Sequence, residues 1–131
     1  MGKVFLGTIA YTVIVFPLAL GWHIGLFKDL YEAFGYFEGE PNIPVGFATV
    51  VIQGFALSLL YPRFHTDRPQ GRAFKFAILT GLFFWTSHVL ALVAKQNVPN
   101  ASGFIALETA YLAVQFGLFA VALGLINRPS K

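Results

Sequence analysis

The sequence predicts an all-α membrane protein: a bundle of four transmembrane helices with a short amphipathic helix at the membrane interface after the first span. Hydrophobic residues make up 56% of the 131 residues and charged residues only 11%, whereas a soluble domain carries about 25% charged residues. The apolar residues gather in four long segments, and most of the Lys and Arg residues lie in the connections on one side of them. The length is that of a single domain, residues 1–131.

Each of the four apolar segments is long enough to cross a bilayer. They hold roughly 19–23 residues, and a helix that rises about 1.5 Å per residue needs about 20 residues to cross a hydrocarbon core of about 30 Å. The predicted spans are residues 4–26, 43–61, 74–94 and 104–126. The first is interpreted as a retained span, because the apolar region of a signal peptide is shorter, at about 7–15 residues, and ends at a small-residue cleavage site.

A short amphipathic helix is predicted between the first two spans. In FKDLYEAFGYF the apolar residues Phe27, Leu30, Tyr31 and Phe34 recur at spacings of three and four, and Gly35 follows them. An interfacial anchor is the first interpretation of this segment. A lid over a site on the same side of the membrane is the second.

The distribution of Lys and Arg predicts the orientation. Seven of them lie on one side of the spans and two on the other, which places both termini in the cytoplasm and the chain in the cell inner membrane. The seven are Lys3, Arg63, Arg68, Arg72, Lys75, Arg128 and Lys131, and the two are Lys28 and Lys95.

Small residues along the fourth span recur at alternating spacings of four and three, which is typical of a seam where helices approach closely in lipid. Gly21 and Gly25, on either side of His23 near the end of the first span, leave a second helix face without side chains. The predicted packing residues are Gly21, Gly25, Ala106, Ala110, Ala113, Gly117, Ala120 and Gly124. Glu108, Tyr111 and Gln115 lie on the other side of the fourth helix and should turn into the bundle. We therefore expect a homo-oligomer or a larger membrane complex, with lipid around it.

Polar side chains also recur along one side of each of the other spans, where they predict hydrogen bonds between helices. They are Thr8, Thr12, Thr49, Gln53, Thr80 and Ser87.

Three ionisable side chains lie well inside the spans, at a similar depth from the side opposite the basic connections. Such residues are costly in a membrane and usually face the bundle interior or a cavity. We predict a buried polar or ligand site made of His23, His88, Glu108, Tyr111, Gln115 and Gln53. The predicted aromatic wall is Trp22, Phe84 and Trp85.

Several chemistries remain open for His23, His88 and Glu108. The three could ligate a divalent metal, and the two histidines could be axial ligands of a b-type haem. A proton relay or a site for the polar head group of a lipid or quinone is a further possibility. The simplest interpretation is that Glu108 pairs with a histidine in a purely structural role. The leading prediction therefore includes no metal or cofactor, and these remain alternatives.

Other functional classes find no support in the sequence. There is no cysteine, which excludes disulfides and Cys-ligated metal sites. No phosphate-binding loop, nucleophile elbow or catalytic triad motif is present, and we expect no enzyme. The net charge of +3 comes without a basic stretch interleaved with aromatics, so no nucleic-acid partner is expected.

Two stretches carry a resemblance to a family. LGWHIGLFKDLYEAFG is a first helix that ends in Gly-Trp and leads into an aromatic segment, and GFIALETAYLAVQFGLFAVALGLI is a last helix with an acidic residue and a tyrosine near its start. The chain resembles an uncharacterised family of small bacterial four-helix membrane proteins, a domain of unknown function. His23 stands where that family's pattern has another residue, often aromatic, so the resemblance implies a fold and no activity.

The leading functional hypothesis is a non-enzymatic structural or accessory subunit that packs through its small-residue seams. The first alternative is a bundle that binds a ligand or cofactor (haem, metal, quinone or lipid) near His23, His88 and Glu108. The second alternative is a small oligomeric transporter or channel, with Glu108 and Gln115 along its path.

Overall fold

The computed structural model describes residues 1–66 and 71–128, and these residues form helices and loops but no strand. The elements are α1 (Gly2–Leu20), η1 (Gly21–Leu26), α2 (Lys28–Ala33), α3 (Ile43–Leu60), η2 (Tyr61–Arg63), α4 (Arg72–Trp85), η3 (Thr86–Leu90), α5 (Ala91–Lys95) and α6 (Ala101–Ile126). Two cations in the orientation argument, Arg68 and Lys131, lie outside the described residues.

The predicted fold class is confirmed. Four continuous helical stretches are long and apolar enough to span a membrane: Gly2–Leu26, Ile43–Arg63, Arg72–Lys95 and Ala101–Ile126. Each predicted span lies inside one of them. The side chains of Asn42 and Asn100 cap the second and fourth stretches, accepting hydrogen bonds from the backbone N–H groups of Val45 and Gly103 at 3.1 and 3.3 Å.

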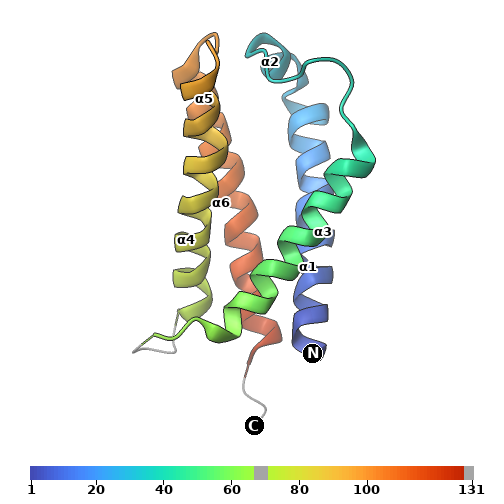
Figure 1. Cartoon of the computed structure of the whole chain (residues 1–131), viewed down its shortest axis with the longest axis vertical. Helices are drawn as coiled ribbons and strands as arrows, with labels where there is room; N and C mark the ends of the chain where they lie inside the picture. The colour runs from blue at the N-terminus through green and yellow to red at the C-terminus, as the bar shows by residue number, and fades with distance from the viewer. Residues whose placement is uncertain (67–70, 129–131) are drawn as a thin grey trace.

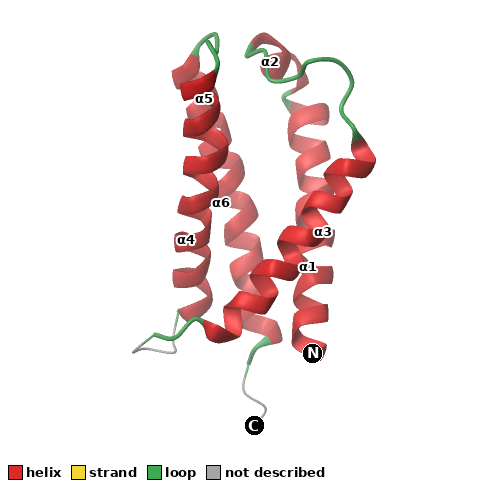
Figure 2. Ribbon diagram, viewed as in Figure 1, coloured by secondary structure: helices red, strands yellow, loops and turns green. Residues whose placement is uncertain are grey.

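The four spans form two pairs, α1 with α3 and α4 with α6, which are joined by the contact between α1 and α6. The helix α1 packs against α3 and α6, and α6 also packs against α4. In Figure 1, α3 crosses obliquely in front of α1, and the N-terminus, the end of α3, the start of α4 and the end of α6 lie at the bottom. The helix α2 and the α5–α6 connection lie at the other end, called the α2 end below. Figure 2 shows that a long loop joins α2 to α3.

Gly54 allows α1 and α3 to approach closely, whereas the sequence pattern indicated Gly21 and Gly25 for a close helix contact. A Cβ added at Gly54 would lie 3.0 Å from the Cβ of Tyr11 and 3.2 Å from the carbonyl oxygen of Thr8. Gly21 and Gly25 are exposed, and a Cβ at either would meet no atom of another helix within 4 Å. The prediction that these two receive a neighbouring helix is wrong within the chain.

The small-residue seam of α6 is only partly used by the chain itself. Ala120 is fully buried, and a Cβ at Gly124 would lie 3.9 Å from the Cβ of Ala73 on α4. Gly117 lines a groove between α4 and α6. The remaining members face outward, and they are Ala106, Ala110 and Ala113.

The threonine and serine side chains do not link helices as predicted. Each hydroxyl donates to the carbonyl four residues earlier in its own helix, at 2.8–2.9 Å; they are Thr8, Thr12, Thr49, Thr80 and Ser87. The reason is that this carbonyl is the nearest acceptor in an apolar environment.

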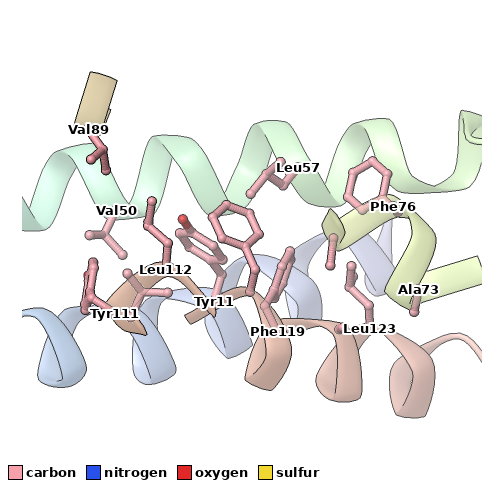
Figure 3. Packing of buried hydrophobic residues seen from close by; sticks show 14 of the residues in the cluster. Tyr11, Val50, Leu57, Ala73, Phe76, Val89, Tyr111, Leu112, Phe119 and Leu123 are labelled. Atoms are coloured by element: carbon pink, nitrogen blue, oxygen red, sulfur yellow. The ribbon is translucent and has the colours of Figure 1, made fainter. Parts of the chain in front are cut away.

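The core below the polar residues is apolar and aromatic. Tyr11 and Phe119 meet edge to face with ring centroids 4.8 Å apart, and Leu123 and Leu57 pack in the same cluster (Figure 3). Burying these side chains fixes α1, α3 and α6 relative to one another, and with them the polar groups nearer the α2 end.

Candidate functional site

Glu108 is the centre of a buried polar cluster near the α2 end of α6. Its side chain has no exposed surface. Oε1 lies 2.8 Å from Nε2 of His23 and also accepts a short hydrogen bond from the Tyr31 hydroxyl. Oε2 accepts a hydrogen bond from Nε2 of His88 at 3.0 Å. The two histidines and the glutamate, which the sequence placed at one depth, therefore meet.

Both histidines lie in π-helical turns. His23 lies in η1, which ends the first helical stretch, and His88 lies in η3, which interrupts the third stretch between α4 and α5. Pro17 precedes η1 and lacks the N–H that an α-helix needs at that position. A π turn holds an extra residue and so rotates the following side chains, and such turns are frequent at functional sites. Because α6 packs between α1 and α4 (Figure 1), the two rings reach one carboxylate from opposite sides.

Both ring nitrogens of His23 are engaged. Nδ1 donates to the carbonyl oxygen of Ala19 at 3.0 Å, while Nε2 faces Glu108. The ring is packed between Tyr31 and Tyr111, with centroid distances of 4.5 and 4.6 Å. His23 is therefore held in one position, whereas 40% of the His88 side chain remains exposed.

The amphipathic helix α2 covers this cluster. Tyr31 and Phe34 are buried while Leu30 is exposed. The Tyr31 hydroxyl accepts a hydrogen bond from Nε1 of Trp22 at 3.1 Å and donates to Glu108. Of the two interpretations of this segment, a covering lid describes its contacts better than a surface anchor.

Sequence reasoning missed two tyrosines of the cluster. Tyr31 belongs to the predicted apolar face of the amphipathic helix, and Tyr36 directly follows Gly35, where that helix is predicted to end. The Tyr36 hydroxyl lies 3.3 Å from Nε2 of His88. Burial, followed by the hydrogen bond to Glu108, raises the pKa of Tyr31 above its usual range. Burial and the charge of Glu108 raise the pKa of Tyr36 in the same direction. Both hydroxyls therefore keep their protons next to the carboxylate.

A second polar group lies deeper in the bundle. Nε2 of Gln115 donates to the Tyr11 hydroxyl at 2.8 Å, and that hydroxyl donates to Oε1 of Gln53 at 3.2 Å. The two predicted glutamines are thus joined through a tyrosine of α1 that was not among the predicted site residues. The bonds connect α1, α3 and α6.

A cavity of about 350 Å³ adjoins both polar groups. Segments from α1, α3, α4, α6 and the α2–α3 loop line it. Its polar lining includes His23, His88, Tyr111, Gln53 and Gln115, and its apolar lining includes Val15, Phe16, Ile24, Val45 and Phe84. Glu108 lies behind the two histidines. The space therefore suits a molecule that is mainly apolar with a hydrogen-bonding head.

Of the three residues predicted to form an aromatic wall, one lines the cavity. Phe84 lines the cavity. Trp22 lies one layer behind it, with its ring 5.9 Å from that of Tyr111. Trp85 turns into the groove between α4 and α6, where its Nε1 donates to Oγ1 of Thr109 at 2.9 Å. Neighbouring residues on a helix point about 100° apart, and here that separation directs Phe84 into the cavity and Trp85 into the α4–α6 groove.

The residues of the cluster do not fit a haem or a metal ion. Axial ligation of haem iron by His23 would require a free ring nitrogen, and both are hydrogen-bonded. The Nε2 atoms of His23 and His88 face different oxygens of one carboxylate. Among residues 1–66 and 71–128, no group of three or more His, Asp or Glu side chains has an arrangement that could hold a metal ion.

The polar residues stop about halfway along the bundle. Between Tyr11 and the opposite end of the bundle the buried side chains of the described residues are apolar, including Leu57, Phe119 and Leu123, apart from Ser58; the next polar groups, of Tyr61 and Arg72, lie at that end. Within the described residues of the single chain, the polar site is therefore confined to the half of the bundle nearer α2.

Comparison with known proteins identified no relative of the chain. No protein-family model matches the chain, and neither a curated protein nor a solved structure matches it.

Proposed function

We propose that this multi-pass membrane protein binds a lipid-soluble molecule with an oxygen-bearing polar head, such as a quinone, in the cavity beside His23 and His88. The observation that carries the proposal is the lining of that cavity, which combines polar groups from four segments with an apolar wall. Ligand sites are typically mostly apolar with a few fixed polar groups. A purely structural subunit has no use for an open cavity next to a buried carboxylate.

Each part of the cluster supports a role in recognition. The half-exposed His88 can donate to or accept from an oxygen of the head group, while Glu108 orients its ring. Tyr111 and Gln115 offer further hydrogen-bonding groups on α6. The helix α2 separates the carboxylate from the aqueous side. We place that side outside the cytoplasm and the chain in the inner membrane, because seven of nine Lys and Arg residues belong to the opposite side.

Tryptophan fluorescence tests the proposal. In a Trp85→Phe background, Trp22 is the only remaining tryptophan, and it lies next to Tyr31 and Tyr111. Titration of decylubiquinone into the purified protein in detergent should quench its emission in a saturable way. Quenching that rises linearly, with no saturation, would count against a site.

A pair of glycine variants provides the control. Gly46 lines the cavity and a Cβ there meets nothing within 4 Å, so Gly46→Leu fills open space and should abolish saturable quenching. Gly117 is equally unobstructed but lines the α4–α6 groove, so Gly117→Leu should leave quenching unchanged. Equal quenching in both variants would locate the quinone elsewhere.

A second role, as a subunit of an oligomer, is favoured by one observation. Ala106, Ala110 and Ala113 form an exposed small-residue stripe on α6, and such stripes allow close helix contact in lipid. A cysteine at Ala110 should form a cross-linked dimer in membranes, and a cysteine at the exposed Val13 of α1 should not. Monomers alone in both cases would reject the oligomer.

A further inference from the structure

A second cavity, of about 690 Å³, lies at the end of the bundle opposite α2. It is formed by the start of α4, the end of α6 and Tyr61. Its basic lining residues are Arg72 and Arg128, and its apolar lining includes Phe74, Ala120, Val121 and Leu125. From Ala120 to the end of α6 at Ile126 the helix rises about 9 Å at 1.5 Å per residue, and Arg128 lies two residues beyond that end. The cavity therefore runs from a basic end into an apolar one.

Among the described residues, the groups that hold Arg72 in place are backbone carbonyls and an aromatic ring, with no acidic side chain. Its Nη2 donates to the carbonyl oxygens of Tyr61 and Pro62 at 2.7 and 2.9 Å, and its guanidinium carbon lies 4.7 Å from the centre of the Tyr61 ring. Its Nε is buried and has no hydrogen-bond partner in the described part of the chain. A buried donor without an acceptor is costly, so the guanidinium is left incompletely satisfied by the described residues.

The basic residues at this end of the bundle are not matched by an equal number of acidic residues. Five of the six acidic residues belong to the α2 half of the protein, namely Asp29, Glu32, Glu38, Glu40 and Glu108. Asp67, which lies outside the described residues, is the single acid on the side that carries seven Lys and Arg residues. No acidic side chain is found among the described residues that line the cavity.

We propose that this cavity binds an anionic phospholipid, with its phosphate at Arg72 and Arg128 and the first part of an acyl chain along α4 and α6. Guanidinium groups match the geometry of phosphate oxygens, and basic groups at a membrane surface attract anionic lipids. The apolar lining then gives the lipid an advantage over a free anion. This site is separate from Glu108 and does not depend on the proposed quinone site.

Lipid retention measured by native mass spectrometry tests the proposal. The full chain, purified in mild detergent, is mixed with phosphatidylglycerol or with phosphatidylcholine of the same acyl chains. Arg128→Gln and Arg72→Gln should each weaken phosphatidylglycerol binding about fivefold, because one basic group near the surface contributes about that factor. Binding of phosphatidylcholine should be weak and unchanged.

Arg63→Gln is the matched control. Arg63 belongs to the same basic side, but its Nη1 donates to the carbonyl of Leu59 and it does not line the cavity. It should leave phosphatidylglycerol binding unchanged. Equal losses in Arg63→Gln and Arg128→Gln would show that general surface charge, and not this cavity, holds the lipid.

Two further measurements keep the test decisive. Arg72 donates hydrogen bonds to two backbone carbonyl oxygens, and their loss in Arg72→Gln could prevent folding. In that case Arg72→Lys and Arg128→Gln still test the site. Inorganic phosphate at a hundredfold excess over the lipid should displace little of it. Full displacement by phosphate would overturn the lipid assignment in favour of a free-anion site, and unchanged binding in Arg128→Gln and Arg72→Lys would overturn the site itself.

Discussion

The Nε2 atom of His23 lies 2.8 Å from Oε1 of Glu108, while Nδ1 of the same ring donates to the carbonyl of Ala19. A neutral imidazole has one N–H, and here both nitrogens face acceptor groups. One additional proton must therefore lie between Nε2 and Oε1. It belongs either to an imidazolium paired with a carboxylate or to a carboxylic acid that donates to a neutral ring. In both forms the pair is electrically neutral, which limits the cost of burying it.

The first prediction concerns this shared proton. Nitrogen NMR of labelled histidine and infrared spectroscopy of the carboxyl group should find either a doubly protonated His23 or a protonated Glu108 at neutral pH. In Glu108→Gln, His23 should become neutral with its proton on Nδ1. An ionised Glu108 together with a neutral His23 in the wild-type protein would contradict the prediction.

Glu108→Gln should also destabilise the fold. Oε1 of Glu108 faces both Nε2 of His23 and the Tyr31 hydroxyl, and Oε2 faces Nε2 of His88. A glutamine cannot share a proton with His23 as a carboxyl group does, and its amide nitrogen must take one of these two oxygen positions. We expect a loss of about 1–3 kcal/mol in the free energy of unfolding, measured by titration with SDS in mixed micelles. A variant as stable as the wild type would show that the cluster relaxes freely.

Tyr31→Phe should cost more than Tyr36→Phe. The Tyr31 hydroxyl joins Trp22 to Glu108, so its removal leaves two buried polar groups each short of a partner and should cost about 1–3 kcal/mol. The Tyr36 hydroxyl makes one longer contact of 3.3 Å to the half-exposed His88, so its loss should cost less. Unfolding in SDS measures both, and the reverse order would mean that α2 is not held through Tyr31.

Alkaline pH should weaken the attachment of α2. The pKa values of Tyr31 and Tyr36 are raised in the folded protein above the usual value of about 10. The folded state thus keeps protons that the unfolded state releases. The stabilisation is complete below about pH 10 and is lost as the pH rises towards the folded-state pKa values. The free energy of unfolding should fall above this pH in the wild type, and less steeply in the double variant Tyr31→Phe/Tyr36→Phe.

Two glycines of α3 should respond in opposite ways to the same substitution. A Cβ at Gly54 would be 3.0 Å from Tyr11 and would push α3 away from α1, so Gly54→Ala should destabilise by about 1–3 kcal/mol. A Cβ at Gly46 meets nothing within 4 Å, so Gly46→Ala should be neutral or stabilising by up to about 1 kcal/mol. Equal effects in SDS titration would place the α1–α3 contact elsewhere.

The sequence could predict the spans and the depth of the ionisable residues because both depend on position along a helix. Segment lengths fix where helices cross a membrane, and a rise of about 1.5 Å per residue places His23, His88 and Glu108 at one level. Burial cost then indicates that such residues face inward. These arguments need no knowledge of which helices are neighbours.

The lid and the wall could not be predicted in the same way. Helical periodicity identifies the apolar face of α2, but not the partner of that face, and Tyr31 resembles an anchor until Glu108 is placed beneath it. The π turns around His23 and His88 shift the side-chain directions that a regular helix would give. Trp85 precedes the second π turn, and its position in the α4–α6 groove depends on where α6 packs, which periodicity does not give. The close approach of α1 and α3 occurs at Gly54 and not at the exposed Gly21 and Gly25, for the same reason.

The orientation can be tested with single cysteines, because the chain has none of its own. Glu38 lies in the exposed loop at the α2 end, and His65 lies at the opposite end. Since basic residues remain on the cytoplasmic side, a membrane-impermeant maleimide should label Glu38→Cys in intact bacterial spheroplasts. His65→Cys should react only after the membrane is permeabilised, and that reaction also shows that the variant is present. The opposite pattern would place α2, and the cavity beneath it, on the cytoplasmic side.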